Sequence, residues 1–156
     1  MQIALPIAFA LFVWWFSTGV ILYLDGLPQR TFRWTLLAAT GALVLAFWGL
    51  VGSRADTSAL GAYCGFACAV LIWAWQEIAF LLGAITGPRR TALPAGTTGW
   101  RRAYFALQAV LHHEIALLGL GIAVYAVAAN APNPTGWWTF LALWAMRQSS
   151  KLNVFL

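Results

Sequence analysis

The sequence predicts an all-α membrane protein, a polytopic transmembrane helical bundle of about five spans. Hydrophobic residues make up 62% of the 156-residue chain and charged residues only 8%, whereas an average soluble domain is roughly a quarter charged. The apolar residues gather in stretches that approach the length of about 20 residues that a helix needs to cross a bilayer. Tryptophans stand near the ends of several of these stretches, as interfacial anchors do. We therefore expect lipid to surround the helices.

Turn-rich segments divide what we expect to be a single membrane domain, residues 1–156. The expected spans are about 3–24, 34–52, 59–85, 104–129 and 137–156. The first span has no basic region before it and continues at full length, so it is not typical of a cleavable signal peptide. The second follows an arginine-containing turn. The third contains both cysteines, which indicate no disulfide framework, and the fourth carries an HHE triplet. The fifth begins with a tryptophan pair and carries two basic residues in its body.

The distribution of arginine predicts the orientation of the chain. Cytoplasmic loops of membrane proteins are enriched in Lys and Arg. The first and third loops contain Arg30, Arg33, Arg89, Arg90, Arg101 and Arg102. The second loop has only Arg54, offset by Asp56, and the fourth loop has no charge. We therefore expect a periplasmic N-terminus and odd loops in the cytoplasm. The net charge of +5 then reflects topology and headgroup contact, not nucleic-acid binding.

Four charged residues fall inside expected spans and invite pairing, since an unpaired charge in hydrocarbon costs several kcal/mol. They are Glu77, Glu114, Arg147 and Lys151. By residue count, Glu114 and Arg147 both lie about 15 Å from a span end and near the midplane, while Glu77 and Lys151 lie roughly 10 Å from the cytoplasmic face. Depth therefore predicts the pairs Glu114–Arg147 and Glu77–Lys151. The alternative for Lys151 is that its ammonium snorkels to the interface.

The adjacent His112 and His113 have several interpretations. Metal ligands on one helix need spacings of three or four residues to converge, and this triplet lacks them, so no metal site is predicted from this helix alone. A neutral histidine could instead ligate the magnesium of a chlorophyll, because small residues on the same faces leave room for a macrocycle. The simplest interpretation is a histidine that forms a hydrogen bond with a neighbouring helix.

The loop TGPRRTALPAGTTGWRR also has alternatives. Its arginines, Arg89, Arg90, Arg101 and Arg102, could bind anionic headgroups, a phosphorylated substrate or an acidic partner surface. They could equally serve only as a topology determinant, because no glycine-rich phosphate loop accompanies them. The sequence leaves this choice open.

Several stretches together resemble the photosynthetic complex assembly protein 2 family, the PuhE type, of phototrophic bacteria. They are W-x-W-x-E ending at Glu77, TGPRRT, GWRR, the pair His113–Glu114, APN at residues 131–133, and the C-terminal R-x-S-x-K-L-N from Arg147 to Asn153. The resemblance covers the last three spans well and the first two only in hydropathy. The chain departs from the pattern at Gln76, where a histidine is expected. Family members also continue beyond KLNVFL, so we expect this chain to be the N-terminal portion of a longer one.

The resemblance implies a protein of the bacterial inner (intracytoplasmic) membrane that takes part in biogenesis of the reaction centre and its light-harvesting antenna. Reaction-centre and antenna subunits and membrane lipids are the implied partners, and bacteriochlorophyll, carotenoid or bound lipid the candidate cofactors. We interpret the chain as an assembly factor or accessory subunit that docks laterally through its helices. The rival interpretation is an intramembrane enzyme acting on a lipid, quinone or pigment through Glu77, His112, His113 and Glu114. Whether it is an enzyme stays open, with the packing role favoured.

Overall fold

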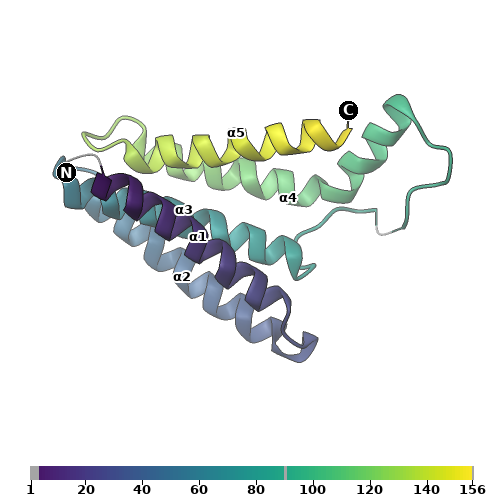
Figure 1. The fold of residues 1–156 in the computed structure, drawn as a ribbon, viewed down its shortest axis with the longest axis horizontal. Helices are drawn as coiled ribbons and strands as arrows, with labels where there is room; N and C mark the ends of the chain where they lie inside the picture. Colours follow the sequence, from purple (N-terminus) through teal and green to yellow (C-terminus); the bar gives the residue numbers. More distant parts are fainter. Residues whose placement is uncertain (1–3, 90, 156) are drawn as a thin grey trace.

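The fold was obtained as a computed structural model, which describes residues 4–89 and 91–155. Over these residues all of the regular secondary structure is helical. They are α1 (Ala4–Asp25), the short 3₁₀ helix η1 (Gln29–Thr31), α2 (Phe32–Ser53), α3 (Ala59–Leu81), α4 (Gly99–Ala128) and α5 (Thr135–Phe155) (Figure 1). The predicted all-α class is confirmed. The third expected span ends earlier than predicted, at Leu81, and the fourth begins earlier, at Gly99.

Four of the helices, α1 to α4, are long and apolar enough to cross a membrane by length and composition. Helix α5 has 21 residues, which at 1.5 Å per residue is also sufficient to span a bilayer. Helix α5 is less apolar than the other four because of its polar stretch from Arg147 to Lys151, so its composition does not place it among these candidate spans. A fifth helix is therefore confirmed, whereas its passage through the bilayer and the orientation of the termini stay predictions.

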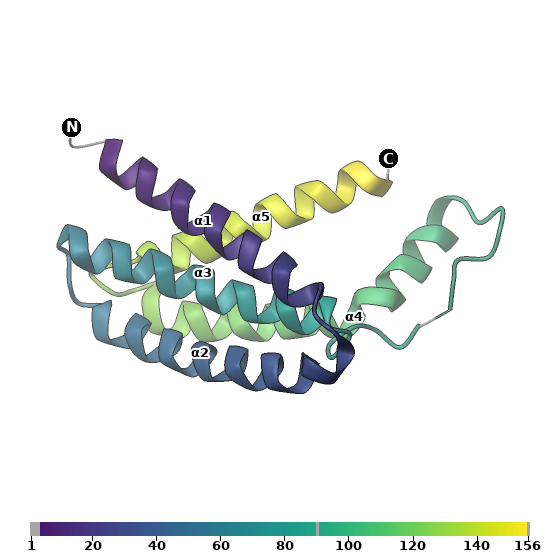
Figure 2. The same cartoon turned by 60° about the horizontal axis from the view of Figure 1, so that its bottom comes forward.

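Helix α3 lies at the centre of the bundle and packs against each of the other four α-helices (Figures 1 and 2). Helices α4 and α5 form an antiparallel pair on one side of α3, and α2 lies along another side. Helix α1 rests on α3 and contains no buried residue. Because α3 is so enclosed, it supplies more of the buried side chains than any other described helix, and it is the helix from which Glu77 projects.

The apolar core lies between α2, α3, α4 and α5. Its buried members are Ala46, Leu50, Cys68, Ile72, Leu117, Val124, Ala128 and Phe140. The Phe140 ring is fully buried and meets the Trp73 ring edge-on, with centroids 5.5 Å apart. Gly121 of α4 faces this ring, and a Cβ there would lie 3.2 Å from it. Close approach of helices at small residues is the usual basis of packing in lipid, and here it brings α5 against α4.

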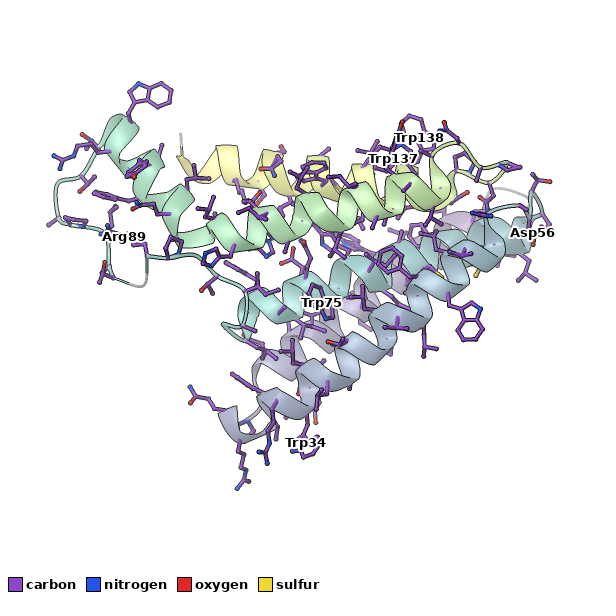
Figure 3. All side chains as sticks on the ribbon, turned by 180° about the vertical axis from the view of Figure 1, so that it is seen from behind. Trp34, Asp56, Trp75, Arg89, Trp137 and Trp138 are labelled. Atoms are coloured by element: carbon purple, nitrogen blue, oxygen red, sulfur yellow. The ribbon has the colours of Figure 1, made fainter. Side chains whose placement is uncertain are left out.

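The α2–α3 and α4–α5 loops meet at one end of the bundle. The backbone N–H of Asn133 donates to Arg54 O at 2.9 Å, and its side-chain Nδ2 donates to Ser53 O at 3.0 Å. Figure 3 places Asp56, Trp137 and Trp138 at this end and Arg89 at the opposite end. The two arginine-poor loops therefore share one end, which is the arrangement that the positive-inside rule requires of loops on the same side.

Replacing Asn133 by Ala is expected to lower the free energy of unfolding by about 2 kcal/mol, the typical cost of leaving buried polar groups unpaired. The change removes the donor to Ser53 O and the acceptor for Thr135 N–H at 3.2 Å. Unfolding in mixed micelles would measure the effect. Asn130→Ala is the matched control, because Asn130 is exposed in the same turn. Equal effects of the two substitutions would contradict the role given to Asn133.

Candidate functional site

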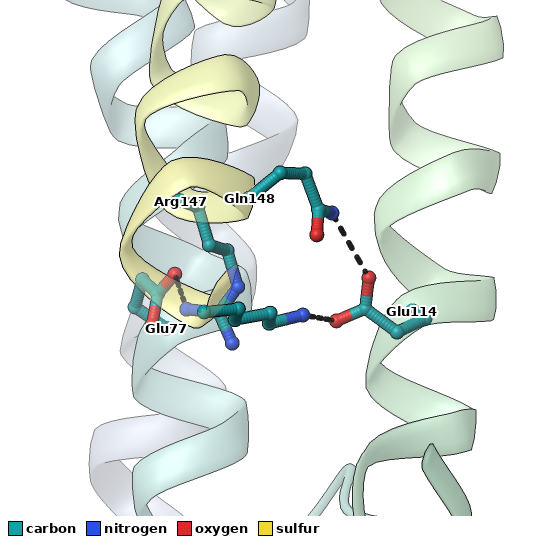
Figure 4. A network of polar contacts seen from close by, with 5 residues as sticks. Glu77, Glu114, Arg147 and Gln148 are labelled. Carbon is teal, nitrogen blue, oxygen red and sulfur yellow. Dashed lines mark hydrogen bonds and ion pairs between the residues drawn. The ribbon is translucent and has the colours of Figure 1, made fainter. Parts of the chain in front are cut away.

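The four charged residues predicted to lie inside spans meet between α3, α4 and α5 (Figure 4). Arg147 Nη1 lies 2.7 Å from Glu77 Oε1 of α3. Lys151 Nζ forms an ion pair with Glu114 Oε1 of α4, and Gln148 Nε2 donates to Glu114 Oε2 at 3.3 Å. One face of α5 thus contacts a carboxylate on each of the two neighbouring helices. The cluster contains two acids and two bases, so its formal charges cancel.

The predicted partners were wrong: the structure pairs Glu77 with Arg147 and Glu114 with Lys151, the reverse of the assignment by depth. A step of four residues changes depth by only about 6 Å, which a Lys or Arg side chain easily bridges. The partner is decided instead by the helix that each side chain of α5 faces. Lys151 is also engaged with Glu114 and does not extend alone toward the interface.

Both pairs lie at the edge of the packed interior. The side chains of Glu77 and Arg147 are each 18% exposed, and those of Lys151 and Glu114 are 23% and 21% exposed. The Arg147 guanidinium also lies 5.6 Å from the centre of the Phe80 ring, within range of a cation–π contact. Neutralisation by a partner is what makes charged residues tolerable at this depth. The arrangement fixes α5 against both α3 and α4.

The two histidines face different surroundings. His113 is fully buried, and its ring packs on the Phe80 ring with centroids 4.5 Å apart. Within the described residues neither of its ring nitrogens has a hydrogen-bond partner, so the predicted side-chain hydrogen bond to a neighbouring helix was wrong for this residue. His112 is exposed on the outer surface of α4. Pigment ligation by either residue stays a prediction.

Side chains that commonly bind metals are not gathered in the part of the chain that the structure describes. Among them, no group of three or more His, Cys, Asp or Glu side chains could hold a metal ion. Cys64 and Cys68 are free, with their sulfur atoms 4.0 Å apart. Glu77 and Glu114 each form an ion pair with a base of α5.

The α3–α4 loop docks its backbone onto the first half of α4, the part in which that helix bends (Figure 2). His113 N–H donates to Thr86 O at 3.1 Å, and Arg89 N–H donates to Gln108 O at 3.4 Å. Gly87 lies between these contacts, and a Cβ there would be 2.6 Å from the carbonyl carbon of Ala109. The glycine of TGPRR therefore permits close contact of two backbones. This role was not predicted from the sequence, in which a glycine directly before a proline was the only available signal.

The basic residues of this loop differ in their contacts. Arg89 lies over the Phe105 ring at 4.0 Å and donates to Ala92 O at 3.0 Å. Arg101 and Arg102 are exposed on the first turn of α4. Arg90 lies outside the described residues. Arg89 and Arg102 border a pocket of about 180 Å³. The choice between headgroup, phosphate or acidic-partner binding and a topological role stays open.

The sequence matches, over residues 1–156, the family described as "Protein of unknown function (DUF3623)". The chain belongs to this family. A relative of the DUF3623 chain, described as "Uncharacterized 30.4 kDa protein in puhA 5′region" of Rhodobacter capsulatus, is 34% identical over 150 residues. The alignment covers 94% of this chain and 55% of the relative, so the chain spans about half the relative's length. No solved structure matches the DUF3623 chain.

Proposed function

We propose that this DUF3623 chain is an assembly factor or accessory integral subunit of the bacterial reaction centre–light-harvesting complex, located in the intracytoplasmic membrane. The observation that carries the proposal is the relative in the puhA 5′ region of Rhodobacter capsulatus, which points to a photosynthesis-gene context. The resemblance of the C-terminal stretch from Arg147 to Asn153 to a family of phototrophic bacteria supports the same context. The membrane helices supply the means of association, because partners of such a complex meet within the bilayer.

Helix α1 supports a docking role because it offers a large apolar surface. It has no buried residue, and its bulky side chains are exposed, including Trp14 at 54% and Trp15 at 72%. A groove of about 420 Å³ runs beside it against α2 and α3. A second groove of about 560 Å³ lies against α3 and α5. Ridges beside grooves favour helix association in lipid, where van der Waals packing supplies much of the driving force.

The ion pairs support a structural use of the intramembrane charges. Each carboxylate of Glu77 and Glu114 is held by a base from α5, and such pairing keeps the helices in register. In this proposal the cluster maintains the scaffold, and the exposed faces of the helices recognise the reaction-centre or antenna subunits.

One observation favours the rival function, an intramembrane enzyme. A pocket of about 470 Å³ between α4 and α5 is lined by Glu114, Gln148 and Lys151 as well as by apolar residues, so a lipid-soluble substrate could meet polar groups there. Glu114→Gln distinguishes the two functions. An enzyme should lose turnover while it inserts and associates normally, whereas a scaffold should lose abundance or association.

Site-specific photo-crosslinking in a phototrophic host tests the docking proposal. A benzophenone amino acid replaces Trp15 on α1 or, as the control, Ile122 on α4, which is 61% exposed. Helix α4 packs on the opposite side of α3 from α1 (Figure 2). We expect adducts with reaction-centre or antenna polypeptides from position 15 and few from position 122. Adducts with lipid alone at both positions would contradict docking through α1.

A further inference from the structure

A group of buried polar atoms near the ion pairs has no protein partner within the described residues. They are both side-chain atoms of the Gln76 amide, both ring nitrogens of His113, Nε1 of Trp144 and Nε of Arg147. Gln76 and His113 are fully buried. Buried polar groups in folded proteins nearly always form hydrogen bonds, with protein or with ordered water. The partners of these atoms therefore need to be found.

The helix register brings these side chains to the same end of the apolar core. Ile72, Leu117 and Phe140 belong to the same core cluster on α3, α4 and α5. Gln76, His113 and Trp144 each lie four residues, or about one helical turn, from one of them. The step is forward in the sequence on α3 and α5 and backward on α4. Because α4 runs antiparallel to α3 and α5, all three steps lead toward the same end of the bundle. These three residues thus lie just beyond the same end of the apolar core, in a polar layer that spans about two helical turns, because the Phe80 ring that contacts His113 stands one turn beyond Gln76.

Phe80 and Arg147 close this layer on its other side. The Phe80 ring, one turn beyond Gln76, contacts the His113 ring at 4.5 Å and lies 5.6 Å from the Arg147 guanidinium. The layer lies beside the two ion pairs, because Glu77 and Glu114 directly follow Gln76 and His113 in the chain. The pockets of about 260 and 470 Å³ beside α5 reach Glu77 and Glu114, but neither Gln76 nor His113 lines them.

The chemistry of the atoms decides which occupant fits. Trp144 Nε1–H and Arg147 Nε–H are donors, the Gln76 amide supplies donors and an acceptor, and a neutral His113 supplies one of each. A cation would face the two N–H donors. An anion would leave the Gln76 carbonyl and one His113 nitrogen without a donor. Water both donates and accepts, and a buried water typically makes about three hydrogen bonds to groups of this kind.

We propose that internal water molecules occupy this layer, hydrogen-bonded to Gln76, His113, Trp144 and Arg147. These waters join the Glu77–Arg147 pair to His113, the residue beside Glu114 in the chain. The three helices then share a single polar layer within the membrane. The site is independent of the proposed function, since it concerns the interior of the bundle and not its docking faces.

Water-edited solid-state NMR tests the proposal on the whole chain in phosphatidylcholine vesicles. The chain has only two histidines, so ¹⁵N-histidine labelling gives ring signals from two residues. The variant His112→Gln loses one set of signals and thereby assigns the other to His113. We expect rapid magnetisation transfer from water to the His113 ring N–H. Gln76→Leu should markedly reduce this transfer. Gln148→Leu is the matched control, since that amide is already bonded to Glu114, and it should leave the transfer unchanged.

The unmodified protein alone decides the main question, so the test does not depend on folding of the Gln76 variant. Absence of water transfer to the His113 ring would overturn the proposal. So would a direct coupling between the Gln76 amide and the His113 ring, because the two side chains would then satisfy each other. An equal loss of transfer in Gln76→Leu and Gln148→Leu would also count against this location of the water.

Discussion

Glu77→Gln is expected to lower the free energy of unfolding by roughly 3 kcal/mol, close to the cost of placing an arginine at the centre of a membrane helix. The substitution leaves the Arg147 guanidinium without its carboxylate partner at 2.7 Å. The residual 18% exposure of both side chains makes this value an upper estimate. Reversible unfolding in mixed micelles measures the effect, with circular dichroism to confirm that the variant is helical before unfolding.

A double-mutant cycle then tests the choice of partner. Glu77→Gln and Arg147→Gln should be coupled by about 1 kcal/mol, within the range measured for polar contacts between membrane helices. Glu114→Gln and Arg147→Gln serve as the matched control cycle, because Glu114 pairs with Lys151 in the structure. Stronger coupling in the control cycle than in the Glu77 cycle would restore the assignment by depth and contradict the structure.

Gly87→Ala is expected to be similarly damaging, by about 3 kcal/mol, the upper part of the range for overpacked sites. A Cβ at this position would collide with the Gln108 carbonyl oxygen and approach the Ala109 carbonyl carbon to 2.6 Å. Both contacts are with backbone, which cannot move aside as a flexible side chain would. The loop should therefore leave α4, and the hydrogen bond from His113 N–H to Thr86 O should be lost.

Hydrogen exchange at the His113 amide measures this loss directly, and we expect faster exchange in Gly87→Ala. Gly119→Ala is the control in the same helix, because a Cβ there meets nothing within 4 Å. An exposed helical Gly→Ala change should stabilise the helix by up to about 1 kcal/mol. Unchanged His113 exchange in a folded Gly87→Ala variant would show that the loop does not depend on the close contact.

Hydropathy and span length were sufficient to predict the helices, because the length of a membrane helix is set by bilayer thickness and not by tertiary detail. They also located Glu77 and Glu114 inside spans. Pairing could not be predicted in the same way. Depth follows from residue count, but the direction in which Arg147 and Lys151 project depends on how α5 is rotated against α3 and α4, which requires the packed structure.

The remaining parts of the site depend on contacts far apart in the sequence. Gln148 bonds Glu114 across 34 positions, and nothing in its local sequence indicates that partner. Gln76 is fully buried, although it stands beside Glu77 in an apolar helix and could equally have faced outward. The docking of Thr86 and Gly87 on α4 requires a loop to fold back on the helix that follows it, which helical periodicity does not encode.

Purification from a phototrophic host in mild detergent, with and without prior crosslinking in cells, tests the central proposal most directly. The measurement is the absorption spectrum of the preparation together with the identity of its co-purifying polypeptides. The proposed function predicts reaction-centre or antenna subunits with their near-infrared bands, at least in the crosslinked sample. A colourless preparation that lacks these subunits under both conditions would contradict it.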